Sequence, residues 1–128
     1  MTAQERRIRS EVDAVFSTKE AEANLSAERS NFENKRPKER TREDWQRLTA
    51  AAYGCRLALQ RAIYNMISIE DEYVGALLAN RGLAAELASI REGMEKKLTE
   101  LQRFERTVIH TQAISDQTRS TANASAVL

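Results

Sequence analysis

Apolar residues in the middle of the chain recur at alternating steps of three and four, the spacing of a helix that packs along one face. This seam consists of Trp45, Leu48, Ala52, Cys55, Leu59, Ala62, Met66, Ile69, Tyr73 and Ala76. The residues that flank it and widen the apolar surface are Leu57, Ile63, Tyr64 and Ile67. The pattern predicts a central helix over residues 42–79 that contacts neighbours on more than one side. An offset near Ser68 is the alternative, because Ser68 and Asp71 have the spacing of a helix cap.

Two short segments mark the ends of this helix. Pro37, the only proline of the sequence, lacks a backbone donor and restricts the residue before it, so it predicts a boundary. Thr41 followed by Asp44 supplies an N-cap and an acid in the first turn, which puts the helix start at Arg42. Residues 80–82, Asn-Arg-Gly, predict the stop, because Asn and Gly tolerate the left-handed geometry found beyond helix ends.

Residues 2–34 form the first predicted segment. Thr2 lies three residues before Glu5, as in a capping box. A clear apolar face follows, made of Ile8, Val12, Val15 and Phe16. The face then falters, because Lys19 and Glu22 occupy the positions where it should continue. A single helix that rotates past its partner is the favoured interpretation, and a break near Ser17 is the alternative.

A second long apolar stripe follows residues 80–82 and predicts a third helix over residues 83–114. Its members are Leu83, Leu87, Ile90, Met94, Leu98, Leu101, Phe104 and Val108. Residues 115–128 are small and polar with no stripe, so we expect a mobile tail outside a single domain of residues 1–114.

Three segments of similar length predict an all-α, elongated antiparallel three-helix bundle with up-down-up topology. The alternative is a helical hairpin in which residues 42–114 form one long coiled-coil arm that pairs in a dimer. Composition favours the all-α class, since the chain has one Pro, four Gly and 30% charged residues.

The net charge of +1 gives no steering of the whole chain toward nucleic acid or anionic membranes. The longest apolar runs are far shorter than the roughly 20 residues that span a bilayer, so we expect no membrane insertion. The first residues mix acids and bases without an apolar stretch, and the single cysteine cannot form an internal disulfide. These features predict a cytoplasmic location.

A basic cluster between the first two segments is a candidate phosphate-binding loop, with Trp45 as a stacking residue one turn into the following helix. The basic residues are Lys35, Arg36, Lys38, Arg40 and Arg42. The favoured interpretation is a solvated loop with Trp45 in the core, because Trp45 begins the seam and no nucleic-acid-binding motif surrounds the cluster.

Candidate catalytic and metal-binding chemistry is sparse, and we expect no enzyme activity, metal or cofactor. Residues 70–72, Glu-Asp-Glu, point in different directions on a helix and do not converge. A di-iron bundle needs Glu-x-x-His spacings, whereas the only histidine, His110, follows Thr107 at that spacing. Cys55 lies in the seam, where a thiol usually serves as a small buried apolar group.

The remaining functional signal is an apolar surplus outside the seam. The candidate partner-binding or dimer surface is made of Leu57, Tyr64, Ile67, Val74 and Leu78. Tyr53, Ile109 and Ile114 also lie off the main stripes. Such a surplus predicts a helical protein-protein interaction module that forms a homodimer, such as an adaptor, assembly factor, inhibitor or small chaperone. A nucleic-acid-associated regulator that uses the basic loop is the alternative.

Overall fold

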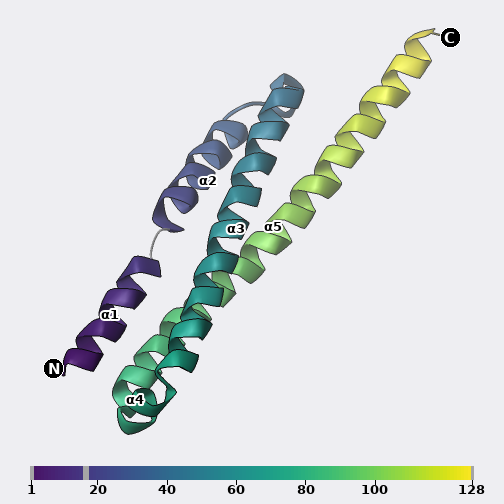
Figure 1. The fold of residues 1–128 in the computed structure, drawn as a ribbon. Coiled ribbons are helices and arrows are strands. Elements are labelled where there is room, and N and C mark those ends of the chain that lie inside the picture. Colours follow the sequence, from purple (N-terminus) through teal and green to yellow (C-terminus); the bar gives the residue numbers. More distant parts are fainter. Residues whose placement is uncertain (1, 16–17, 128) are drawn as a thin grey trace.

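The computed structural model describes residues 2–15 and 18–127, with side-chain surroundings as far as residue 118. The elements are α1 (Ala3–Val15), α2 (Thr18–Glu33), the short 3-10 helix η1 (Pro37–Glu39), α3 (Arg42–Glu72), α4 (Val74–Ala79) and α5 (Arg81–Val127). The helices form an elongated bundle in which α1 and α2 lie along one side of α3, and α5 lies along another (Figure 1). The predicted all-α class and up-down-up order are confirmed.

The first segment contains α1, which ends at Val15, and α2, which begins at Thr18. Phe16 and Ser17, where the alternative break was expected, lie outside the described residues, so the choice between one helix and two stays a prediction. Ile8, Val12 and Val15 are buried against α3 and α5. In α2 the apolar side chains are only partly buried, as expected where the stripe loses phase.

α3 begins as the sequence predicts. The Thr41 hydroxyl accepts a hydrogen bond from the Asp44 backbone N–H at 3.2 Å, and Asp44 Oδ2 accepts one from the Thr41 N–H at 2.8 Å. This reciprocal capping box satisfies two backbone donors that the first turn would otherwise leave without partners. Together with Pro37 in η1, it fixes the direction in which the chain enters α3.

The far end of α3 differs from the prediction. The helix is interrupted at Tyr73, which has φ −106° and ψ 27°, and the six residues of α4 follow. The expected single helix over residues 42–79 is therefore divided, five residues after the alternative break at Ser68. The Tyr73 side chain is buried with Ile69 and Leu77, so the seam passes through the interruption.

Asn80 forms the turn into α5, but for a different reason from the one expected. No described residue has a positive φ. Instead, Asn80 Oδ1 accepts a hydrogen bond from the Leu83 N–H at 3.1 Å, so Asn80 caps the start of α5. Gly82 lies within the helix. The alternative of one uninterrupted arm over residues 42–114 was therefore wrong.

Two ion pairs show that α3 and α5 are antiparallel. Arg56, in the middle of α3, lies 3.0 Å from Glu105, and Glu70, late in α3, lies 2.7 Å from Arg91, which comes earlier in α5. α5 continues to Val127, well past the predicted end at residue 114, and its last part extends beyond the bundle (Figure 1). No Gly or Pro follows Gly93 to stop the helix. The mobility of residues 115–128 stays a prediction.

α3 supplies side chains to the core along its whole length. Met66 packs with Ile8 and Leu87 near α1, and Leu59 packs with Leu101 in the middle. Near the start of α3, Leu48 and Trp45 pack with Val108. The predicted seam is therefore the centre of the bundle. Among the residues whose side chains the structure describes, one flank of α3 stays exposed.

Candidate interaction surface

The exposed flank of α3 carries a second regular series of mostly apolar side chains, which we call the α3 stripe. Its members are Tyr53, Leu57, Gln60, Tyr64, Ile67 and Asp71, and all of them are exposed. They recur at alternating steps of four and three, so they lie on one face of the helix. Tyr64 is 71% exposed, which is unusual for a large aromatic side chain at the centre of a helix. A series with this spacing is suited to packing against a second helix.

Val74 and Leu78 are also exposed and follow the stripe in sequence, on α4 beyond the interruption at Tyr73. Leu78 is 76% exposed. All members of the predicted partner surface therefore reach solvent. Ile63, which the sequence grouped with the flanking residues, is instead buried in the core beside α1. Some of the apolar residues outside the seam are therefore buried within the bundle, and the apolar residues of the α3 stripe stay exposed.

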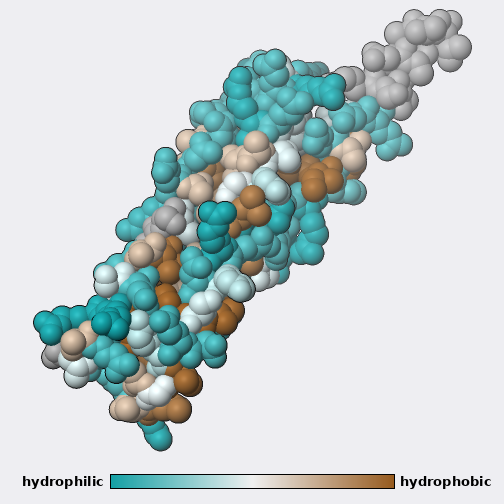
Figure 2. Space-filling model, in the orientation of Figure 1, coloured by the Kyte–Doolittle hydropathy of each residue, from teal (hydrophilic) through white to brown (hydrophobic). Residues whose placement is uncertain are grey.

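Ile109 and Ile114 on α5 are exposed as well. They are five residues apart, so they do not share one face of the helix. Figure 2 shows that apolar residues reach the surface at separate points between broad hydrophilic areas. The α3 stripe differs from such scattered residues because its members follow a single regular spacing.

The acidic residues 70–72 do not form one site. Glu70 faces α5, where it accepts a hydrogen bond from Arg91 Nε at 2.7 Å. Arg91 also donates to Glu95 at 3.0 Å, and these hydrogen bonds raise the pKa of its guanidinium. Asp71 belongs to the α3 stripe, and Glu72 is exposed at the end of the helix. The expectation that these three side chains point apart is confirmed.

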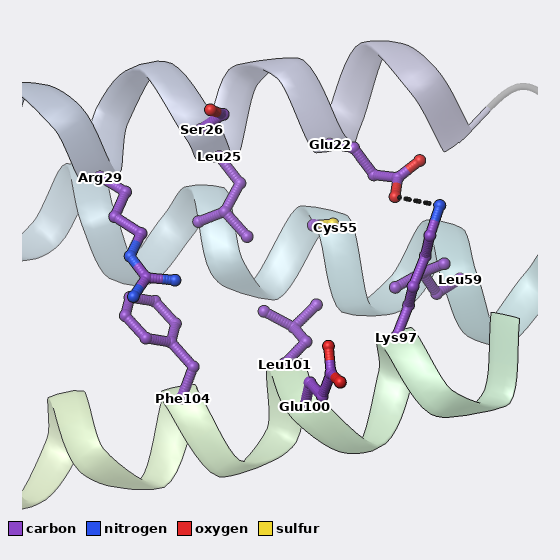
Figure 3. A pocket seen from close by; sticks show the side chains of 10 residues that line it. All are labelled: Glu22, Leu25, Ser26, Arg29, Cys55, Leu59, Lys97, Glu100, Leu101 and Phe104. Atoms are coloured by element: carbon purple, nitrogen blue, oxygen red, sulfur yellow. Dashed lines mark ion pairs between the residues drawn. The ribbon is translucent and has the colours of Figure 1, made fainter. Parts of the chain in front are cut away.

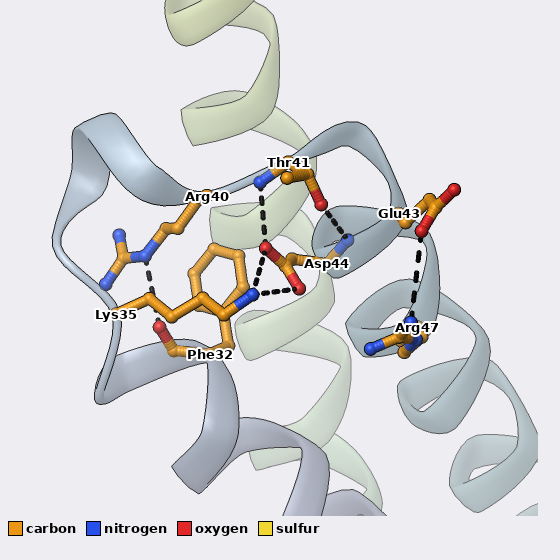
Figure 4. Close-up of polar contacts among 7 residues, drawn as sticks. All are labelled: Phe32, Lys35, Arg40, Thr41, Glu43, Asp44 and Arg47. Atoms are coloured by element: carbon orange, nitrogen blue, oxygen red, sulfur yellow. Dashed lines mark hydrogen bonds and ion pairs between the residues drawn. The ribbon is translucent and has the colours of Figure 1, made fainter.

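The basic loop is held largely by contacts with its own helices (Figure 4). Lys35 Nζ donates to both carboxylate oxygens of Asp44 at 2.9 Å. Arg40 donates to the Phe32 carbonyl oxygen at 3.1 Å, and its guanidinium lies 4.2 Å from the centre of the Phe32 ring. Two of the five candidate phosphate contacts, Lys35 and Arg40, therefore have structural partners. The other three, Arg36, Lys38 and Arg42, are exposed.

Trp45 is buried, with its ring edge-on to Phe32 at a centroid distance of 4.7 Å. It also packs in the cluster that contains Leu48 and Val108. The interpretation of Trp45 as a core residue is confirmed. To stack on a nucleic-acid base, Trp45 would have to leave the core. Trp45 therefore gives the basic loop no aromatic surface for stacking.

Asp44 gives the loop a specific dependence on pH. Its hydrogen bonds with the Thr41 backbone and with Lys35 lower the pKa of the carboxyl group from 3.8 to about 2. Because the folded-state pKa lies below the unfolded value, the stability contributed by Asp44 is present above pH 3.8 and is lost as the pH falls toward 2.

We therefore expect Asp44→Asn to be less stable than the native chain by a constant amount above about pH 5, and by a shrinking amount below about pH 4. Urea unfolding of both proteins at a series of pH values measures this difference. A difference that does not change with pH would contradict the assignment of the stability to the ionised carboxylate.

A groove of about 310 Å³ lies between α2 and α5, with α3 as its floor (Figure 3). Glu22 and Lys97 cross one end of it as an ion pair at 3.1 Å. At the other end the Arg29 guanidinium lies 4.4 Å from the centre of the Phe104 ring. The charged groups at both ends therefore contact partners within the protein.

Cys55 lies at the floor of this groove and is only 3% exposed. Burial, with a smaller contribution from the negative charge of Glu22, raises the pKa of its thiol. A raised pKa keeps the sulfur protonated, and the thiolate is the reactive form. The predicted burial of Cys55 is confirmed, and its low reactivity stays a prediction.

We expect a thiol reagent to label Cys55 in the native protein at least about a hundredfold more slowly than in the urea-unfolded chain, because both burial and protonation oppose attack. Labelling followed by mass spectrometry measures both rates. Rapid stoichiometric labelling of the native protein would show that the groove opens to admit the reagent.

Within the described residues, no cluster of three or more His, Cys, Asp or Glu side chains is arranged to hold a metal ion. None of the described helices has the length and apolar character needed to cross a membrane. No protein-family model matches the chain, and no curated protein or solved structure matches it. The surfaces described above are therefore the basis for a functional proposal.

Sequence reasoning singled out the apolar residues of the exposed surface but not its polar members. Gln60 and Asp71 complete the alternating steps of the α3 stripe, and that spacing is visible in the sequence. The signal was hidden because the buried seam of the same helix has the same period. The groove between α2 and α5 was also not predicted, since it depends on how the two helices diverge.

Proposed function

We propose that this protein is a non-enzymatic helical interaction module that self-associates through the α3 stripe. The observation that carries the proposal is the regular series of exposed apolar side chains on the central helix, with Tyr64 at its middle. Apolar area removed from water contributes about 25 cal/mol per Å², and aromatic residues contribute strongly to interfaces. A helix that presents such a series gains stability when a second helix covers it.

The role that fits such a module is that of an adaptor, assembly factor, inhibitor or small chaperone. Proteins of each of these classes act by binding another protein rather than by catalysing a reaction. The α3 stripe supplies a binding face on a helix. A single buried cysteine, Cys55, is in keeping with a reducing compartment such as the cytoplasm.

A nucleic-acid-associated regulator is the second candidate. The exposed side chains of Arg36, Lys38 and Arg42 favour it, because they lie close together in sequence around η1. Lys35 and Arg40 weaken it, since both have partners within the protein. Binding to generic DNA or RNA that weakens steeply with added salt, and that is lost when the three exposed residues are replaced, would support this candidate.

Covalent footprinting with hydroxyl radicals tests the main proposal. We expect Tyr64 to become protected as the protein is concentrated from nanomolar to tens of micromolar, because self-association covers the α3 stripe. His110 is exposed on α5 and serves as the internal control, whose modification should not change. Equal reactivity of Tyr64 at both concentrations would contradict self-association through this face.

A further inference from the structure

The α3 stripe has the same residue spacing in both chain directions. Its steps alternate between four and three, so a second copy that runs in the opposite direction presents the same series. In antiparallel helix pairs, heptad positions of one type lie opposite positions of the other type. With the two-fold axis between Asn65 and Met66, Tyr64 of one copy lies opposite the partner's Ile67. Gln60 then lies opposite the partner's Asp71.

Every apolar member of the surface meets another apolar residue in this register. Leu57 lies opposite the partner's Val74, and Tyr53 lies opposite the partner's Leu78. These two outer pairs include residues of α4, which follows the interruption at Tyr73. The two central pairs lie entirely within α3, so they do not depend on the direction of α4.

The polar members of the α3 stripe favour this antiparallel register over the other possible pairings. In a parallel pair Asp71 would face the partner's Asp71, and two carboxylates would repel each other beside apolar side chains. An antiparallel pair displaced by one heptad would place Gln60 opposite Tyr64 and Asp71 opposite Tyr53. Only the register centred between Asn65 and Met66 places the two polar residues opposite each other, where the Gln60 amide can donate to the Asp71 carboxylate.

We propose that the occupant of the α3 stripe is a second copy of this chain in antiparallel orientation, with Gln60 of each protomer hydrogen bonded to the partner's Asp71. The contact is isologous, so each polar pair occurs twice about the two-fold axis. This inference rests on the self-association proposed above and adds the orientation and register. Within the described chain neither the Gln60 side chain nor the Asp71 side chain has a hydrogen bond or ion pair that the dimer would have to break.

Disulfide cross-linking tests the register. In a Cys55→Ala background, cysteines replace both Gln60 and Asp71, and the protein is oxidised gently before digestion with trypsin. Cleavage after Arg56, Arg61 and Arg81 places the two cysteines in different peptides. Within one helix the two positions are about 16 Å apart, too far for an internal disulfide.

We expect the peptide pair that joins position 60 to position 71 to dominate. Pairs that join 60 to 60 and 71 to 71 would establish a parallel dimer, and a dimer with none of these links would place the contact elsewhere. Either result overturns the register while leaving self-association intact. A monomer by light scattering would instead overturn the proposed function and the register with it.

A matched pair of charge variants gives an independent measurement. Gln60→Lys places an ammonium opposite the partner's Asp71, and Gln60→Glu places a carboxylate there. We expect the lysine variant to dimerise at least about tenfold more tightly than the glutamate variant. Circular dichroism confirms that both remain helical. Equal dimerisation constants would contradict the proposed pair, and weakening by both charges would indicate that position 60 faces its own copy.

Discussion

Replacing Ile67 with glutamate is expected to convert the dimer into a folded monomer. Ile67 lies near the centre of the α3 stripe and is about half exposed within one chain, so the bundle itself does not require it. In the dimer the new carboxylate would lie among apolar side chains without a positive partner. Burying an unpaired charge costs about 3 kcal/mol or more, which weakens association by more than about a hundredfold. The symmetry of the contact applies this cost twice.

Sedimentation equilibrium measures the dimerisation constant, and circular dichroism measures the helical content of the same samples. Ala27→Glu is the matched control, because it adds the same charge at an exposed position of α2. We expect the control to dimerise like the native chain. An Ile67→Glu protein that still dimerises with native affinity would exclude the α3 stripe as the contact.

Truncating Leu59 to alanine is expected to destabilise the fold by about 2 to 5 kcal/mol, the range for a packed leucine. Leu59 is 2% exposed and packs with Cys55 and Leu101 at the middle of the bundle. Removing its methyl groups leaves a cavity where α2, α3 and α5 meet. Neighbouring side chains can collapse into this cavity only partly.

Leu57→Ala is the matched control, two residues away on the same helix and 40% exposed. In dilute solution, where the monomer dominates, we expect it to cost less than about 1 kcal/mol because the side chain is partly exposed to solvent in the folded monomer. Chemical denaturation of both variants gives the comparison. A cost below about 1 kcal/mol for Leu59→Ala would mean that the seam is not the core of the bundle.

Local signals predicted the boundaries well where one residue type has a specific backbone effect. Pro37 and the Thr41–Asp44 capping box fix the start of α3, since both act within a few residues. The seam also predicted which face of α3 is buried, because helical periodicity and burial depend on the same spacing.

The sequence predicted less where the outcome depends on neighbouring helices. Tyr73 keeps the phase of the seam, so nothing local marked the interruption there. The length of α5 was underestimated because apolar periodicity ends after Val108, whereas no Gly or Pro follows to stop the helix. To predict that Ile63 is buried and Tyr64 is exposed, one would have to know on which side of α3 the helix α1 lies.

Self-association through the central helix is the central claim, and the molar mass in solution tests it most directly. Multi-angle light scattering at micromolar concentration should give twice the 14.5 kDa of the chain. A mass near 14.5 kDa would contradict the claim, because the α3 stripe would then remain exposed to water in the native protein.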